Sequence, residues 1–241
     1  MKKTALFFLL LMLSANLAHS QVLIALLLGD KLNSDKFEMG IRLAGNWGGL
    51  TGMEGANSRF ALGFGIYGTF KMSDKFSIQP EFLFKEPRGA EGLSPEVFDN
   101  PSLDPLLADA KVAMKLAYFA LPVLFKYSLN PNLSFGFGPQ VGYLRSAQNV
   151  YVAEVYAKDD LVFKDNIKSG LNKFDFALAF NLEYKLQKRG IHIGLRYYLG
   201  LTDIVKDNPG GSIKNSVIQI NLGIPMGGKK KAQKADPAGE K

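Results

Sequence analysis

Cysteine is absent from the 241-residue sequence. Disulfide bonds therefore cannot hold the fold together, and a lipid anchor attached through cysteine is excluded. Hydrophobic residues nevertheless make up 47% of the chain, which excludes a disordered protein. The cohesion of the fold must come from its secondary structure.

Histidine is almost as scarce, since the chain contains only His19 and His192. Clusters of histidine and carboxylate residues at metal-ligand spacing are missing, so we predict neither a metal site nor a cofactor. A hydrolase or acyltransferase would need a serine and an acid beside His192. No serine lies among residues 191–201. We therefore predict no catalytic residue and no enzymatic activity, with His192 as an interior hydrogen-bonding side chain.

The sequence also lacks an apolar run of the roughly 20 residues that a membrane-spanning helix needs. At the N-terminus, two lysines precede the apolar residues 5–13, and a small-residue cleavage site ends at Ser20. This pattern predicts a signal peptide over residues 1–20 and export from the cytoplasm, with Gln21 as the first mature residue. Residues 21–35 follow as a short apolar lead-in segment.

The formal net charge of +7 lies mostly at the two ends of the chain. Two lysines leave with the signal peptide, and residues 227–241 form a basic tail that we expect to be flexible. The basic residues are not interleaved with aromatic residues on one face. The sequence therefore predicts no binding of nucleic acid.

Residues 173–186 (KFDFALAFNLEYKL) show the clearest periodicity in the chain. Phenylalanine, leucine and tyrosine occupy alternate positions, which predicts a β-strand with one apolar face. The strand is long enough to cross a bilayer when tilted. Its other face has small residues such as Ala177 and Ala179 at the centre, as in the crowded lumen of a small barrel.

The same alternation recurs along the chain and predicts eight strands in all. We expect them at residues 36–46, 60–71, 75–85, 112–127, 133–144, 173–186, 191–201 and 217–226. Short turns alternate with long connections, which include loops at residues 47–58, 86–110 and 145–171. The sequence thus predicts an all-β protein, an eight-stranded antiparallel up-and-down transmembrane β-barrel over residues 36–226, in the outer membrane.

Charged residues recur on the inward-facing parity of these strands. An eight-stranded barrel is just wide enough for side chains to fill, so opposite charges are expected to pair across its lumen. The predicted interior polar network consists of Arg42, Glu81, Lys126, Asp175, Glu183 and Arg196. Within it we expect Glu183 to neutralise a charge such as Arg196.

Residues 63–68 match the GxGxxG pattern of nucleotide-binding loops. They lie inside a predicted strand, and no helix follows. We therefore interpret these glycines as packing residues that leave room for the long side chains of neighbouring strands.

Three functions remain compatible with these patterns. The first is a non-enzymatic outer-membrane barrel whose long external loops contact partners or ligands. The second is a narrow porin-like channel. The third is a soluble lipocalin-like carrier, in which the apolar face would point inward around a ligand.

Several segments together resemble the PorT-like outer-membrane β-barrel family. They are the lead-in VLIALLLGDKLN and the strands FSIQPEFLF, AYFALPVLFKY and GLRYYLGLTDI. The most specific positions are Pro80-Glu81, Leu121-Pro122 and Arg196-Tyr197 with Gly200 and Asp203. In this chain the last strand ends in Ile224-Pro225-Met226, where such barrels usually end in an aromatic residue.

The resemblance extends from Gln21 to about Met226. It implies an eight-stranded outer-membrane barrel in a family whose members mostly lack an assigned activity and whose founding member is associated with protein secretion. The partners that we expect are outer-membrane lipids, the barrel-assembly machinery and proteins of the envelope or of secretion.

Overall fold

The computed structural model describes residues 34, 36–156, 159–187, 190–207 and 210–226. The predicted signal peptide, nearly all of the lead-in segment and the basic tail lie outside the described residues. Within the described part of the chain, no helix has the length and apolar character needed to cross a membrane.

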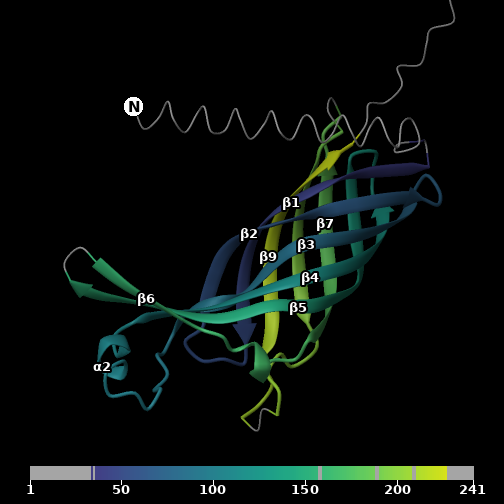
Figure 1. Ribbon diagram of the computed structural model, residues 1–241. Helices are drawn as coiled ribbons and strands as arrows, with labels where there is room; N and C mark the ends of the chain where they lie inside the picture. Colours follow the sequence, from purple (N-terminus) through teal and green to yellow (C-terminus); the bar gives the residue numbers. More distant parts are fainter. Residues whose placement is uncertain (1–33, 35, 157–158, 188–189, 208–209, 227–241) are drawn as a thin grey trace, which may run out of the picture.

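The described chain is dominated by antiparallel β-strands (Figure 1). Their alternation of apolar with small or polar residues places successive side chains on opposite faces. In chain order the elements are β1 (Phe37–Thr51), β2 (Asn57–Lys71), β3 (Phe76–Leu93), α2 (Asp104–Leu107), β4 (Lys111–Ser128), β5 (Leu133–Tyr156), β6 (Asp159–Asp165), η2 (Lys168–Gly170), β7 (Phe174–Lys185), β8 (His192–Gly200) and β9 (Lys214–Pro225).

Eight of the described strands form a closed ring in the order β1, β2, β3, β4, β5, β7, β8, β9. Antiparallel pairing between β1 and β9 closes the ring, with Leu43 opposite Leu222. Closure leaves no free edge in the barrel wall. The predicted fold class is thus confirmed, while β6 pairs with β5 alone and lies outside the ring.

The two faces of β7 show which side of the barrel is apolar. Phe176 and Leu182 are 47% and 45% exposed, whereas Ala177 and Ala179 are buried in the lumen. A water-soluble carrier would need the opposite arrangement, with its apolar face around an internal ligand. The lipocalin-like interpretation is therefore wrong.

Residues 63–68 are packing residues, although at Gly63 and Gly65 the nearest atoms of the neighbouring strand belong to its backbone and not to the long side chains that the sequence predicts. A Cβ on Gly63 would lie 2.8 Å from the carbonyl oxygen of Lys85, and one on Gly65 would collide with that of Phe82. Both contacts involve backbone atoms of β3, which cannot easily move aside. These glycines fit the packing interpretation.

Two strands extend further than the sequence predicts. β1 continues past Asn46 to Thr51 because its outer half pairs with β9. β3 continues through Pro87 to Leu93 along β4, after a register shift between Leu83 and Glu86. Before the shift the odd-numbered residues face the lumen, and after it the even-numbered residues do. A strict period of two therefore does not predict this part of the strand. The expected loops at residues 47–58 and 86–110 are consequently shorter.

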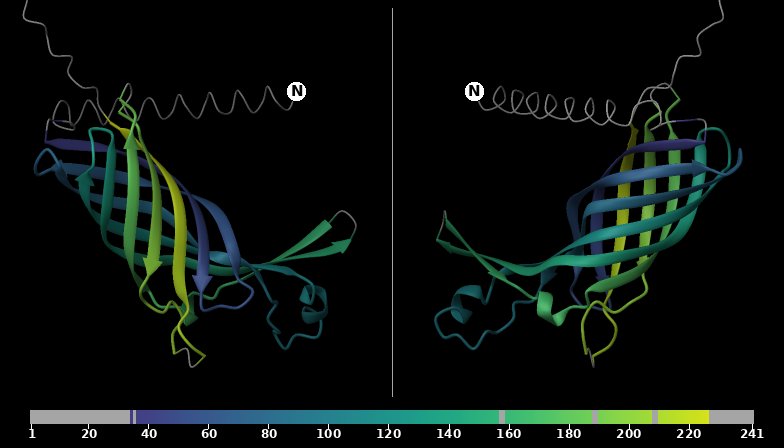
Figure 2. Two further views of the ribbon diagram at one scale, coloured as in Figure 1. Left: turned by 180° about the vertical axis from the view of Figure 1, so that it is seen from behind. Right: turned by 45° about the vertical axis from the view of Figure 1, so that its right-hand side comes forward.

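The expected loop at residues 145–171 is mostly a β-hairpin. β5 runs on to Tyr156 and then pairs with β6, after a register shift between β4 and β5 beside Leu144. The hairpin and the segment carrying α2 form what we call the external lobe, residues 91–115, 149–156 and 159–165. It projects to one side beyond the barrel end that carries the long connections (Figures 1 and 2).

The external lobe has an apolar core of its own. Leu107 of α2 packs with Val112, Tyr151 and Ala153 on one face of the sheet. The rings of Phe98 and Phe163 make edge contacts there, with centroids 5.3 Å apart. This core gives the lobe a defined structure outside the membrane-spanning barrel.

Candidate functional site

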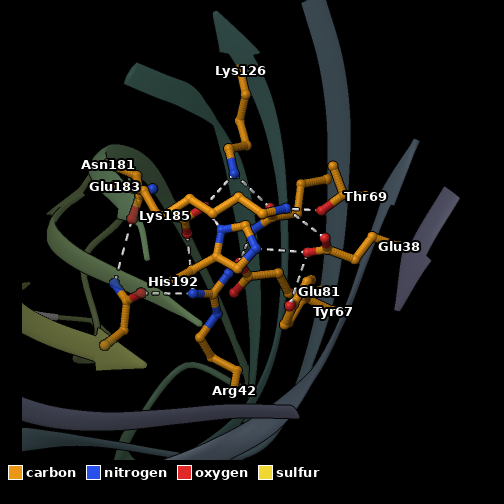
Figure 3. A network of polar contacts seen from close by, with 12 residues as sticks. Glu38, Arg42, Tyr67, Thr69, Glu81, Lys126, Asn181, Glu183, Lys185 and His192 are labelled. Atoms are coloured by element: carbon orange, nitrogen blue, oxygen red, sulfur yellow. Dashed lines mark hydrogen bonds and ion pairs between the residues drawn. The ribbon is translucent and has the colours of Figure 1, made fainter. Parts of the chain in front are cut away.

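The barrel lumen contains a buried network of charged side chains near the end that carries the short turns, hereafter the turn end (Figure 3). Its two centres are Glu81 on β3 and Glu183 on β7. Burying charges is unfavourable unless each is paired and hydrogen-bonded. The geometry of each centre meets this requirement.

Glu81 accepts hydrogen bonds from two arginines. Arg196 on β8 donates from both terminal nitrogens, with Nη1–Oε2 and Nη2–Oε1 distances of 2.7 Å. Arg42 on β1 donates from Nη2 to Oε1 at 3.0 Å. Gln79 adds a fourth bond from Nε2 at 2.6 Å, so the arginines neutralise the buried carboxylate and the amide completes its hydrogen bonding.

Glu183 is the second centre and also has several cationic partners. It forms an ion pair with Lys126 on β4 and lies 3.2 Å from Nη1 of Arg42. Nδ1 of His192 lies 2.9 Å from its Oε1. Arg42 thus links the two carboxylates into one network.

His192 extends this network to the rim of the turn end. Its Nε2 lies 2.7 Å from Oε1 of Glu38, and Oε2 of the same carboxylate accepts a hydrogen bond from Nζ of Lys185 at 2.7 Å (Figure 3). His192 is buried and interior, as the sequence predicts. With a carboxylate at each ring nitrogen, it serves to connect Glu38 with Glu183.

Asp175 lies apart from this network, toward the opposite end of the barrel. It pairs with Arg88 on β3 and accepts hydrogen bonds from Thr202 at 2.8 Å and from Asn215 at 3.1 Å. The guanidinium of Arg88 also stacks on Tyr118, 4.5 Å from the ring centroid. The lumen therefore holds two polar clusters.

The structure thus joins five of the six predicted residues and separates Asp175 from them. The expected neutralisation of Arg196 by Glu183 is wrong, because Arg196 pairs with Glu81 and Glu183 with Lys126 and Arg42. Sequence reasoning missed Arg88, since it lies in the expected loop. The alternation of Glu86, Arg88 and Ala90 was the available signal.

The other end of the lumen, the loop end, is filled by apolar side chains. Leu50, Leu116 and Leu144 from three strands pack with Leu171 and Ile204 from the connections. These connections are held together by the bridge between Leu171 and Val205 and by the hydrogen bond from Asn172 N to Ile204 O. This apolar plug and the polar clusters leave the lumen filled rather than open.

A cavity of about 630 Å³ opens at the turn end. Its lining includes Lys126, Glu183, Lys185 and His192, together with the turns at residues 73–77 and 128–134. Lys126, Glu183, Lys185 and His192 already have partners within the barrel. Among the described residues, no group of three or more histidine and carboxylate residues is placed to hold a metal ion.

A closed antiparallel ring with an apolar outer surface and a paired polar interior defines a transmembrane β-barrel. Tyr127 and Tyr184 lie near strand ends on the outer surface, where interfacial aromatic residues are expected, whereas Tyr143 and Tyr197 lie within their strands on the same surface. Residues 30–206 match the family model described as outer membrane protein beta-barrel domain. The chain belongs to this family and is an outer-membrane protein.

Solved structures with a similar fold include other outer-membrane proteins. Ail, the attachment invasion locus protein of Yersinia pestis, is 10% identical, with 78% of this chain and 97% of that chain covered and a TM-score of 0.43. Neisserial surface protein A is 8% identical, with 78% of this chain and 96% of that chain covered and a TM-score of 0.38. OprG from Pseudomonas aeruginosa is 13% identical, with 79% of this chain and 94% of that chain covered and a TM-score of 0.33. Comparison with curated proteins gave no significant match.

Proposed function

We propose that this protein is a non-enzymatic outer-membrane barrel that contacts a protein partner through its external lobe. The observation that carries this proposal is the separate apolar core of the lobe around Leu107 and Tyr151. Barrel closure does not involve β6 or α2. A lobe with its own core is preorganised, so binding need not be offset by the cost of ordering a loop.

The surface around α2 suggests the chemistry of this partner. Glu96, Asp99 and Asp109 are exposed there, and the apolar side chains of Val97 and Leu106 are 77% and 46% exposed. Charge complementarity steers association and selects partners. We therefore infer a partner with a basic surface and a small apolar contact.

The resemblance to the PorT-like family suggests that this contact is accessory to protein secretion or to another envelope function. In this interpretation the lobe receives an exported protein at the cell surface, and the filled barrel serves as its anchor. The apolar plug around Leu116 and Leu171 supports an anchoring role over the channel hypothesis.

Crosslinking in cells tests the proposal. A photocrosslinker is attached to a single cysteine at Val97 or Leu106, and at Met72 in the turn between β2 and β3 as a control; Met72 is 69% exposed. We expect one secreted or surface protein to be crosslinked from both lobe positions and not from the control. Its yield should fall in the variant Asp99→Lys/Asp109→Lys.

A second measurement connects the contact with secretion. The variant Val97→Ser/Leu106→Ser should change the amount of the crosslinked protein in the medium or on the cell surface, while the barrel remains folded. Unchanged secretion together with equal crosslinking from Met72 would contradict the proposed role.

A further inference from the structure

The sheet of the external lobe has one covered and one uncovered face. The covered face packs on the α2 segment through Val112, Tyr151 and Phe163. Side chains of the intervening residues point to the other face, because successive residues alternate. On this second face Val162 is 51% exposed.

Strand register places three lysines on the uncovered face, with Val162 beside Lys164 at its β6 edge. Lys111 is opposite Val152, which is opposite Val162. Ala113 is opposite Val150, which is opposite Lys164. Lys115 lies two residues further along β4 and is exposed, as are Lys111 and Lys164.

These lysines form a compact triangle. Lys111 and Lys115 are four residues apart on one strand, which corresponds to about 13 Å. Lys164 lies two strands away from β4, which corresponds to about 10 Å. The spacing suits a headgroup that carries more than one phosphate.

The uncovered face continues the lipid-facing surface of the barrel. Lys111 and Lys115 share the parity of Leu121 and Phe125 on β4, whose side chains are 53% and 48% exposed. In the views of Figures 1 and 2, β6 lies nearer the level of the barrel than α2 does. The uncovered face is therefore continuous with the outer surface of the barrel wall.

A fourth cation lies where the lobe leaves the barrel. The guanidinium of Arg145 sits 5.5 Å from the ring centroid of Phe119, on the lipid-facing side. Nζ of Lys168 donates a hydrogen bond to the carbonyl oxygen of Arg145 at 2.8 Å. Positive charge thus continues from the lysine triangle to the outer wall of the barrel.

Acidic residues on the same face lie at its edges. Glu91 is opposite Ala113 and interacts electrostatically with Arg59 of β2. Glu154 and Asp160 are opposite each other near the hairpin tip. The part of the face closest to the barrel is therefore predominantly cationic.

We propose that the face formed by Lys111, Lys115 and Lys164, with Val162 at its β6 edge, binds the phosphorylated headgroup of an outer-leaflet glycolipid. Lysines close to an anionic membrane surface are attracted to it, and each adds to the affinity. The exposed Val162 provides a short apolar contact beside Lys164, at the edge of the headgroup. Binding would fix the lobe over the membrane and leave its α2 face free.

Lipid titration tests this site on the full-length protein in detergent. The probes are bisphosphorylated lipid A and the same lipid after removal of its phosphates, with binding followed by native mass spectrometry. The variant Lys111→Gln/Lys115→Gln/Lys164→Gln should bind the phosphorylated lipid on the order of 100-fold more weakly than the unmodified protein. The corresponding Lys→Arg variant should retain binding.

The matched control is Lys36→Gln/Lys71→Gln/Lys75→Gln, which removes the same charge at the turn end and should bind normally. Heat-modifiable mobility in gels verifies that each variant is folded. Equal affinity of the lobe variant and the unmodified protein would overturn the proposal, as would an equal loss in the control or no preference for the phosphorylated lipid. The proposal depends only on the outer-membrane location, so its failure would leave partner binding through α2 unaffected.

Discussion

Glu81 and Arg196 form a bidentate ion pair across the full width of the barrel lumen. The two contacts are 2.7 Å long, and both side chains are buried. β3 and β8 are four strands apart in either direction around the ring of eight, so the pair connects opposite walls. Arg42 of β1 contacts the same carboxylate, so the ion pair connects a third strand.

Replacement of Glu81 should strongly destabilise the barrel. Glu81→Leu leaves Arg42 and Arg196 without their shared carboxylate, and an uncompensated buried charge costs about 3–5 kcal/mol. Equilibrium unfolding by guanidinium in detergent measures the loss. Glu54→Leu, in the exposed turn between β1 and β2, is the control and should change stability by less than about 0.5 kcal/mol. Similar unfolding of both variants would show that the ion pairs of Glu81 do not contribute to the stability of the barrel.

The pairing of Glu183 can be measured by double-mutant cycles. Glu183→Leu should destabilise the barrel because it leaves Lys126 and Arg42 without a carboxylate partner. Combined with Lys126→Met, the loss should be smaller than the sum of the single losses, with a coupling on the order of 1–3 kcal/mol. The cycle with Arg196→Met should show a smaller coupling, since Arg196 pairs with Glu81. A larger coupling to Arg196 would restore the pairing expected from sequence.

Single cysteines report which face of β7 meets lipid, because the natural chain contains none. A fluorophore at Phe176→Cys or Phe180→Cys should be quenched by spin-labelled lipids, since both positions are on the outer surface. A cysteine at Ala177 or Ala179 should react slowly with a water-soluble maleimide, because these positions are buried in the lumen. Rapid labelling at Ala177 or Ala179 in the folded protein would contradict the transmembrane arrangement.

The filled lumen predicts that the barrel does not conduct ions. The plug around Leu116 and Leu171 occupies the loop end of the lumen, and the ion pairs of Glu81 with Arg42 and Arg196 cross the lumen. Purified protein in planar lipid bilayers should therefore show no stepwise conductance above the level of the bilayer alone. A porin of known conductance serves as the positive control. Steady, voltage-independent channels would support the channel hypothesis instead.

Gly138 should be intolerant of even one methyl group. A Cβ at this position would collide with the carbonyl oxygen of Val123 on the neighbouring strand. Gly138→Ala should thus cost about 1–3 kcal/mol of unfolding free energy. Gly170→Ala is the matched control, because no atom lies within 4 Å of the added Cβ. Equal stability of the two variants would indicate that β4 and β5 can move apart at this point.

The sequence was sufficient to predict the barrel and most of its interior. Period-two alternation decides which residues face lipid and which face the lumen, and it is visible in strands such as β7 without any knowledge of their neighbours. The prediction of Arg42, Glu81, Lys126, Glu183 and Arg196 as interior charges follows from parity alone. The structure places all five inside the lumen.

The partners of these charges were decided only by the tertiary structure. Parity gives the face of a strand, whereas register and strand position around the ring determine which side chains meet across the lumen. Glu81 and Arg196 meet because their strands are opposite each other at the same height, and Asp175 pairs with Arg88 because both lie toward the loop end. The external lobe was hidden for a related reason. Register shifts beside Leu83 and Leu144 interrupt the alternation, so only pairing between distant segments reveals that β3 and β5 continue beyond the barrel.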